Sequence, residues 1–486
     1  MGNRTETGVV IVGTGFSGLG MAIQLRKEGR DDFVILEKAH DVGGTWRDNS
    51  YPGCACDIPS HMYSFSFEQN PGWSRAYSPQ PEIWRYMREV AAKYDLRRFI
   101  RFGQEMTGAR WDADENRWHV STRGGDEFAG DALVAGVGAL HLPQIPELPG
   151  IENFAGPAFH SARWRHDVDL SGKRVAVIGT GASAVQFVPE ITKDVEALTL
   201  FQRTPPWIMP KADHAMSGRT RALFRAFPPA QRAYRTLLYW LLEARAIGFN
   251  GQSWVMKIGQ RLAKRNIDGA IKDPVLRAKV TPDYTMGCKR VLISNDYYPA
   301  LARDNVDVVT AGVQEVREHS LVDAAGVEHE VDAIVYGTGF HVTDAFDDLE
   351  IVGRDGRNLG KEWASEGMRT HLGITVAGFP NLFFLLGPNT GLGHNSVVFM
   401  IEAQISYVAE ALRLARGRAI EPRPEVQERF NTEIQRKLAK GIWTRGGCKS
   451  WYLDAKGVNR TIWPGFTWRY WLDTRKVRRE DFELTS

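Results

Sequence analysis

Cysteine is scarce in this chain of 486 residues, which contains only four. These are Cys54, Cys56, Cys288 and Cys448, and no two of them have the C-x-x-C spacing of zinc and redox motifs. The sequence therefore predicts neither a disulfide framework nor a zinc site, and a reducing cytoplasm fits this cysteine usage best. Because no ligand cluster of cysteines and histidines is present, no metal ion is expected.

Long apolar runs are also absent. The longest interior run covers residues 237–242, whereas a membrane helix needs about 18 or more apolar residues. The segment that follows Met1 lacks the charged stretch and long apolar stretch of a signal peptide. We therefore expect no transmembrane segment and no secretion signal.

The chain has almost no excess charge of either sign. Its 61 Lys and Arg against 58 Asp and Glu leave a formal net charge of +3. So small an excess argues against a nucleic-acid partner. Any bound anion must then be held by a few local cations.

Glycine is abundant, with 48 residues, and two glycine-rich turns follow short apolar strands. They read VVIVGTGFSGLG from Val9 and RVAVIGTGASA from Arg174. Strands that are apolar throughout are typical of parallel sheets covered by helices on both faces. We therefore predict an α/β fold with two Rossmann-like dinucleotide-binding domains.

Both turns match the pattern G-x-G-x-x-G/A. In this pattern the first glycine permits a tight turn, the second lets the backbone approach a pyrophosphate, and the third position lets the helix pack on the strand. The helix then directs its first amides at the phosphates. The residues expected to contact a dinucleotide are Gly13, Gly15, Phe16, Ser17 and Gly18 in the first turn, and Gly179, Thr180, Gly181, Ala182, Ser183 and Ala184 in the second.

The end of the next strand distinguishes the two sites. Glu37, followed by Lys38, and Arg203 each stand 24 residues after the first glycine of their turn. A carboxylate accepts hydrogen bonds from ribose hydroxyls, whereas a guanidinium pairs with a 2′-phosphate. The first site therefore fits FAD, and the second fits NADPH rather than NADH. The alternative is that Arg203 is merely a solvated charge at the end of a strand.

The order of these patterns predicts how the domains are divided. Residues 1–143 and 343–486 are expected to form a discontinuous FAD-binding domain, and residues 144–342 an NADP-binding domain. Residues 211–280 lack strand signals and show helical periodicity with many arginines, which indicates a helical insertion in the second domain. We expect this insertion to pack its apolar face over the NADP-binding domain; a basic amphipathic helix lying on a membrane is the alternative.

Three motifs together resemble the flavin-dependent Baeyer-Villiger monooxygenases, a branch of the class B flavoprotein monooxygenases. The first is GGTWRDNSYPGCACD at residues 43–57, the second is FAGPAFHSARW at residues 154–164, and the third is the pair of dinucleotide motifs that flank them. The segments GCKR, YGTGF and KSWY extend the resemblance over nearly the whole chain. One departure is Arg165, where the family usually has Pro or Asp.

The resemblance implies an enzyme that uses FAD, NADPH and O₂. It would insert one oxygen atom next to the carbonyl of a lipophilic ketone and give an ester or lactone through a flavin carbon 4a peroxide. Arg290 would stabilise the negative charge that develops, and Asp57 would orient Arg290. From the residues alone, without the family pattern, the favoured role of Asp57 is that of an Asx-turn residue that closes the Y-P-G turn.

The resemblance also implies further cofactor contacts. Lys289, Arg203 and Thr204 would share the 2′-phosphate, Trp451 would cover the nicotinamide, and Thr45, Trp46, Asp57, Tyr63 and Arg290 would lie at the flavin. A plain core position is the alternative for Trp451. His160 is interpreted as a hydrogen-bonding anchor in the linker between the domains rather than as a proton carrier.

Two other enzyme classes remain open. Oxygenation of sulfur or nitrogen by the same flavin chemistry needs no carbonyl attack. A flavin disulfide reductase is a remote alternative based on Cys54 and Cys56, whose C-x-C spacing closes too small a ring for an easy disulfide. The sequence leaves the identity of the ketone and the oligomeric state undetermined.

Overall fold

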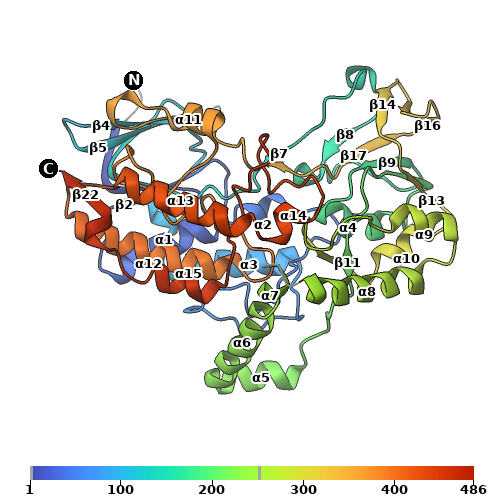
Figure 1. The fold of residues 1–486 in the computed structure, drawn as a ribbon, viewed down its shortest axis with the longest axis horizontal. Helices are drawn as coiled ribbons and strands as arrows, with labels where there is room; N and C mark the ends of the chain where they lie inside the picture. The colour runs from blue at the N-terminus through green and yellow to red at the C-terminus, as the bar shows by residue number, and fades with distance from the viewer. Residues whose placement is uncertain (1–3, 250–252, 348, 486) are drawn as a thin grey trace.

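The protein, described here by a computed structural model for residues 4–249, 253–347 and 349–485, has two lobes side by side (Figure 1). The first lobe contains an eight-stranded sheet in the order β19-β4-β5-β6-β1-β2-β3, with β20 also beside β6. Its strands are β1 (Arg4–Val12), β2 (Phe33–Glu37), β3 (Ile100–Phe102), β4 (Met106–Asp112), β5 (Arg117–Thr122), β6 (Glu127–Ala135), β19 (Glu350–Val352) and β20 (Leu382–Phe384).

Strand β1 lies at the centre of this sheet and runs parallel to both neighbours. Val9 is opposite Phe33 of β2 on one side and Ala132 of β6 on the other. Val9–Val12 of β1, all of β2 and most of β6 are buried, as their apolar sequences predict, whereas the polar first half of β1 is not.

Helices from both ends of the chain cover this sheet, and α1 packs against α12. The helices of this lobe are α1 (Phe16–Lys27), α2 (Thr45–Asp48), α3 (Gln80–Lys93), α11 (Leu359–Glu366), α12 (Val397–Ala415), α13 (Pro424–Leu438), α14 (Ile442–Arg445) and α15 (Thr467–Asp473). Short 3₁₀ turns occur at Arg97–Phe99, Arg354–Gly356 and Arg479–Asp481, and β21 (Ala419–Pro422) pairs with β22 (Phe482–Thr485).

The second lobe is built on a five-stranded parallel sheet in the order β13-β10-β9-β17-β8. The strands are β8 (Ala158–His160), β9 (Arg174–Ile178), β10 (Ala197–Phe201), β13 (Val306–Val309) and β17 (Ala333–Tyr336). Beside them are α4 (Ala182–Ile191), α10 (Tyr297–Leu301), 3₁₀ turns at Ile151–Asn153 and Ser161–Arg163, and a small antiparallel sheet of β14 (Val313–Val316), β15 (Ser320–Asp323) and β16 (Glu328–Glu330).

The chain crosses between the lobes at two places that lie together. Strand β7 (Leu142–Pro143) pairs antiparallel with β18 (Phe340–His341). This pairing supports the predicted domain limits near residues 143 and 343, although the limits themselves stay a prediction. The predicted fold class, two Rossmann-like units with a discontinuous first domain and a helical insertion in the second, is confirmed.

The insertion lies between β11 (Ile208–Met209) and β12 (Leu292–Ile293), which pair in parallel. Its helices are α5 (Gly218–Ala226), α6 (Pro228–Glu243), α7 (Ala246–Phe249), α8 (Ser253–Ala270) and α9 (Pro274–Val280). None of the helices within the described ranges is long and apolar enough to cross a membrane.

The predicted packing of the insertion is correct for α8 and wrong for α6. Helix α8 contacts β11 and buries Ala263 and Ile267. Helix α6 instead buries Gln231, Arg235 and Glu243, because hydrogen-bond partners in the first lobe satisfy these polar groups. Its apolar residues are divided: Leu237, Trp240 and Leu241 are exposed, whereas Leu242 is buried beside the polar groups.

Candidate active site

The first glycine turn joins β1 to α1. Gly13 has φ +98°, a conformation that L side chains rarely adopt, and its amide donates to Leu36 O at 2.8 Å. A Cβ on Gly18 would collide with the carbonyl oxygen of Gly13, whereas a Cβ on Gly15 would meet no described atom within 4 Å. The backbone at Gly15 is therefore open to a ligand, and Phe16 and Ser17 begin the helix behind it.

Glu37 ends β2 directly beside this turn and is buried. Its Oε2 accepts a hydrogen bond of 3.1 Å from the amide of Thr14, and its Oε1 lies 3.0 Å from Nη1 of Arg47. The carboxylate is thus held at the position where ribose hydroxyls would reach it, while Lys38 is exposed next to it. Sequence reasoning missed Arg47 because nothing in the turn pattern points to the helix that carries it.

An aromatic group surrounds the start of α1. The Nε1 of Trp46 donates to the Tyr63 hydroxyl at 3.2 Å, and the ring of Tyr63 lies edge-on to Phe16 at 5.3 Å. Burial raises the pKa of Tyr63 well above its usual range, so this hydroxyl stays protonated. Thr45, also predicted here, begins α2 and is exposed.

The second glycine turn repeats this geometry between β9 and α4. Gly179 has φ +103°, and Ala184, at the third position of the pattern, is fully buried against the sheet. Gly181 and Ala182 are exposed where the helix begins, and the Thr180 hydroxyl donates to Thr204 O at 3.2 Å. Ser183 follows them in the first turn of α4.

Cations gather at the end of β10. Arg203 is exposed, and burial followed by the nearby charge of Arg203 lowers the pKa of Lys289. A hollow in the surface is lined by Arg203, Thr204 and Lys279, among others. Two adjacent cations that repel each other fit a dianionic phosphate. Lys279, 76 residues after Arg203, was missed because only the fold brings it here.

Arg290 and Asp57 come together from the two lobes. Both Nε and Nη2 of Arg290 donate to Oδ2 of Asp57, at 2.9 and 2.6 Å, and Nη1 makes a long contact of 3.5 Å with Leu392 O. The negative charge of Asp57 raises the pKa of Arg290, so the guanidinium is a permanent cation. The predicted proximity of these two residues is thus found, and 29% of the Arg290 side chain remains exposed for a ligand.

Tyr452 is a neighbour of Arg290 that sequence reasoning missed. It is 1% exposed, and its hydroxyl has no hydrogen-bond partner among the described residues. Burial raises the pKa of Tyr452 to about 12, while the positive charge of Arg290 acts in the opposite direction. Trp451 packs on the ring of Tyr452 at 4.4 Å and is 42% exposed, so it is not an ordinary core residue.

The prediction of no disulfide is wrong. Cys288 and Cys448 form one, with their Cα atoms 6.1 Å apart and a separation of 160 positions in the sequence. The spacing rules missed it because they recognise only cysteines that are close in sequence. The bond ties the segment that carries Lys289 and Arg290 to the loop that carries Trp451 and Tyr452. The cysteine usage therefore no longer supports a reducing compartment.

The linker motif between the lobes is structural. His160 is 2% exposed, its Nδ1 accepts from the amide of Ala162 at 3.1 Å, and burial lowers its pKa to about 4. A neutral, fixed imidazole agrees with the predicted anchoring role. Trp164 packs on Phe187 at 5.5 Å, whereas Arg165 pairs with Asp167 at the surface.

Cys54 and Cys56 are buried thiols that are not bonded to each other. Burial raises the pKa of Cys54 to about 12 and that of Cys56 further. Thiols that stay protonated are poor nucleophiles, so these cysteines offer no redox pair for a disulfide reductase.

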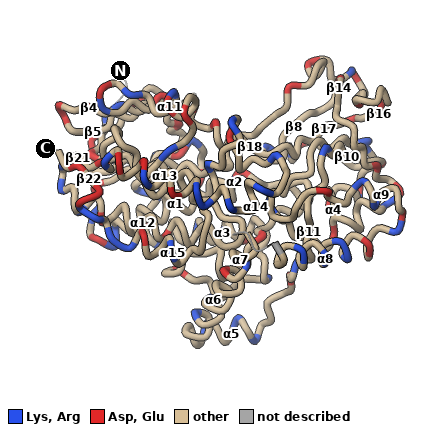
Figure 2. The backbone as a smooth tube through the Cα atoms, viewed as in Figure 1, with Lys and Arg blue, Asp and Glu red and all other residues tan. Residues whose placement is uncertain are grey.

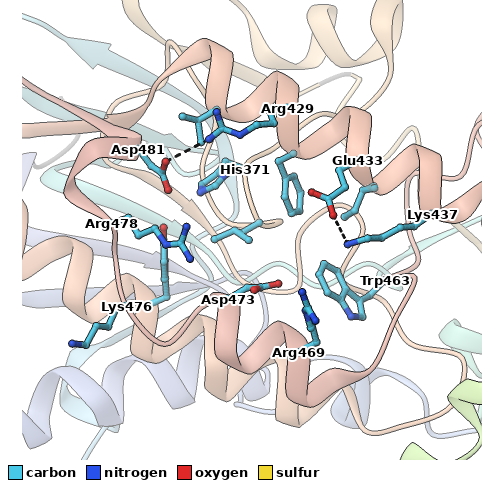
Figure 3. A pocket seen from close by; sticks show the side chains of 15 residues that line it. His371, Arg429, Glu433, Lys437, Trp463, Arg469, Asp473, Lys476, Arg478 and Asp481 are labelled. Atoms are coloured by element: carbon cyan, nitrogen blue, oxygen red, sulfur yellow. Dashed lines mark ion pairs between the residues drawn. The ribbon is translucent and has the colours of Figure 1, made fainter.

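A separate pocket in the first lobe lies between α13, α15 and the C-terminal segment (Figure 3). The close-up shows Arg429 paired with Asp481 and Lys437 paired with Glu433. None of its lining residues belongs to the predicted site.

Comparison with known proteins agrees with this geometry. Residues 6–356 match the family model described as FMO-like, flavin-binding monooxygenase-like. Over 482 residues the chain is 54% identical to a Baeyer-Villiger monooxygenase of Pseudomonas aeruginosa, covering 98% of this chain and 91% of the relative. A Baeyer-Villiger monooxygenase of Streptomyces coelicolor is 50% identical over 480 residues, covering 98% of this chain and 92% of the relative.

Solved structures are similar over the whole fold. Cyclohexanone monooxygenase from Rhodococcus sp. Phi1 bound to NADP⁺ has a TM-score of 0.89 at 29% identity and covers 100% of both chains. An oxidised steroid monooxygenase bound to NADP has a TM-score of 0.88 at 32% identity, covering 99% of this chain and 100% of the other. The chain therefore belongs to the flavin-binding monooxygenase-like family and, within it, to the Baeyer-Villiger monooxygenases.

Proposed function

We propose that this protein is an NADPH-dependent FAD monooxygenase that inserts one oxygen atom of O₂ next to the carbonyl of a lipophilic ketone and so forms an ester or lactone. The observation that carries the proposal is the Arg290–Asp57 pair, which joins a permanent cation from the second lobe to a carboxylate from the first. A cytoplasmic location stays part of the proposal.

The residues present fit FAD on the first lobe. Gly15 leaves room for a pyrophosphate, Glu37 is held where a ribose would lie, and the aromatic group of Phe16, Trp46 and Tyr63 stands at the start of α1. Bound FAD would supply the group that accepts hydride from NADPH and activates dioxygen. The protein would orient FAD and the substrate and provide the charges around them.

The second lobe fits NADPH. The turn from Gly179 to Ala184 would hold the pyrophosphate, and Arg203, Thr204 and Lys289 would hold the 2′-phosphate. Trp451 would cover the nicotinamide from the loop that the disulfide holds beside Arg290.

Arg290 would act on the reacting oxygen atoms. Asp57 engages Nε and Nη2 of the guanidinium and fixes its plane, so that Nη1 is directed toward the carbonyl of Leu392 and the region between the lobes. A preorganised cation of this kind stabilises negative charge as it develops on a carbonyl oxygen. Asp57 balances the charge of Arg290 before substrate binds, and thereby keeps the arginine in place.

The proposal is tested by analysing the products of NADPH-driven turnover with linear, cyclic and aromatic ketones and one thioether. Formation of an ester or lactone, with one atom of labelled O₂ in the product, is expected. Sulfoxide formation without any ester from the ketones would contradict the carbonyl reaction and favour sulfur oxygenation instead.

A further inference from the structure

Helix α6 packs with its polar side inward. The Gln231 side chain donates to Asn70 O at 2.9 Å, and Nη1 of Arg235 donates to Ser64 O at 3.1 Å. At the end of the helix, Oε2 of Glu243 accepts from the Asn395 side chain at 2.7 Å. A buried arginine and a buried glutamate with these partners fix which face of α6 lies against the protein.

The opposite side of the hairpin formed by α5 and α6 is apolar and exposed. Leu237, Trp240 and Leu241 recur at helical spacing on α6 and are 55%, 55% and 58% exposed. Leu223 of α5 and Phe227 between the helices are 52% and 56% exposed. We call these five residues the hairpin face. Several large apolar side chains left in water on one short hairpin are uncommon and mark a surface with a partner.

The segment that carries the hairpin face is rich in positive charge. From residue 214 to residue 247, the only acidic residue is Glu243, which is buried. Arg219, Arg225, Arg232 and Arg245 are exposed, and no ion pair is found for them among the described residues. The hairpin lies at the lower edge of the molecule (Figures 1 and 2), and the accessibility of its apolar residues follows from their exposed fractions.

We propose that the hairpin face docks on the surface of a membrane that contains anionic lipid. Large apolar side chains with a tryptophan on one side and arginines around them match the boundary between acyl chains and negatively charged headgroups. A helix of 16 residues that buries Gln231, Arg235 and Glu243 on its other side is too short and too polar to cross the bilayer, and it would lie in this boundary.

A second copy of this chain matches the hairpin face less well. A two-fold contact would bring the same arginines of both copies together, without an exposed acidic residue between residues 214 and 247 to pair with them. The membrane proposal does not depend on the proposed reaction.

Flotation of the FAD-loaded protein with lipid vesicles tests the proposal. Binding is expected to vesicles that contain phosphatidylglycerol beside phosphatidylcholine, and to decrease when salt is added. The double variant Trp240→Gln with Leu241→Gln should bind at least about tenfold more weakly. Its control is Val327→Gln, an equally exposed apolar residue (52%) in the second lobe, which should bind like the wild type.

A charge variant keeps the test decisive if the apolar variant unfolds. Arg225→Gln with Arg232→Gln should lower binding to the anionic vesicles by about tenfold, whereas Arg110→Gln on β4, whose side chain is 67% exposed, should not. Light scattering gives the oligomeric state of each protein. The proposal fails if the wild type does not float, if both double variants float unchanged, or if the hairpin face proves to hold a dimer that Trp240→Gln with Leu241→Gln converts to a monomer.

Discussion

Arg290 owes its environment to residues that are far apart in the sequence. Asp57 precedes it by 233 residues, Leu392 follows it by 102, and Tyr452 lies in the loop bonded through Cys448. The sequence motifs predicted Arg290 and Asp57 only through their resemblance to a family. Tyr452 is the last residue of the KSWY segment, but this segment does not show that its buried hydroxyl lies beside Arg290, which only the fold determines.

Arg203 should determine the choice of nicotinamide cofactor. In Arg203→Ala, the KM for NADPH should rise by about 10- to 100-fold, because a guanidinium that pairs with the 2′-phosphate is lost. The KM for NADH, which lacks that phosphate, should change by less than about threefold. Steady-state kinetics with both cofactors checks this, with Arg303→Ala on the same lobe as the control. Equal losses with both cofactors would contradict the role of Arg203.

His371 should make stability depend on pH. Burial lowers its pKa to about 4, and both ring nitrogens lack partners among the described residues. The unfolded chain binds this proton below about pH 6.5, so the free energy of unfolding falls as the pH decreases from about 6.5 toward 4.

Between pH 7 and pH 5, the free energy of unfolding should fall by about 2 kcal/mol less in His371→Phe than in the wild type. Urea unfolding at the two pH values measures it. Phe430→Leu alters the packing beside His371 without removing a titrating group and serves as the control. An unchanged pH dependence in His371→Phe would show that His371 does not carry this effect.

At the scale of elements, the two glycine turns could be located from the sequence because strand, turn and helix follow one another directly. The side of α6 that faces inward could not be predicted from the sequence. Helical periodicity shows which residues share a face, but only the partners of Arg235 and Glu243 in the folded chain decide that the polar face is buried.

Alanine substitutions at two glycines of the first turn, Gly15 and Gly18, should have different effects on FAD binding and on stability. Gly15→Ala should leave the stability of the protein without FAD nearly unchanged, because its φ of −72° suits alanine and its Cβ meets no described atom within 4 Å. It should weaken FAD binding at least about tenfold, because the backbone can no longer approach the pyrophosphate.

Gly18→Ala should instead destabilise the protein even without FAD, because its Cβ would collide with the carbonyl oxygen of Gly13. Thermal unfolding and flavin titration separate the two effects. Normal FAD binding by Gly15→Ala would contradict the placement of the pyrophosphate at this turn.

The disulfide joins two loops of the candidate site. Cys448→Ser should lower the free energy of unfolding by about 2–4 kcal/mol, because the loop it closes is long. Chemical denaturation with and without a reductant measures this loss. The reductant should destabilise the wild type and have no further effect on Cys448→Ser; an equal effect on both proteins would mean that this bond does not contribute.

At the scale of the molecule, the two-lobed architecture follows from sequence patterns that are local and repeated. The candidate site lies where the lobes meet, and there local patterns are insufficient. The near-neutral net charge of +3 agrees with this organisation. Positive charge is concentrated at Arg203, Lys289 and Arg290 in the candidate site, and at the arginines around the hairpin face.

Arg290, held by Asp57, should support oxygen insertion and not the delivery of hydride. Two rates in Arg290→Ala distinguish these roles: reduction of bound FAD by NADPH, and formation of ester from a ketone that the wild type converts. Reduction should stay within about threefold of the wild type, and ester formation should fall by about 100- to 1,000-fold. Ester formation at the wild-type rate in this variant would contradict the account.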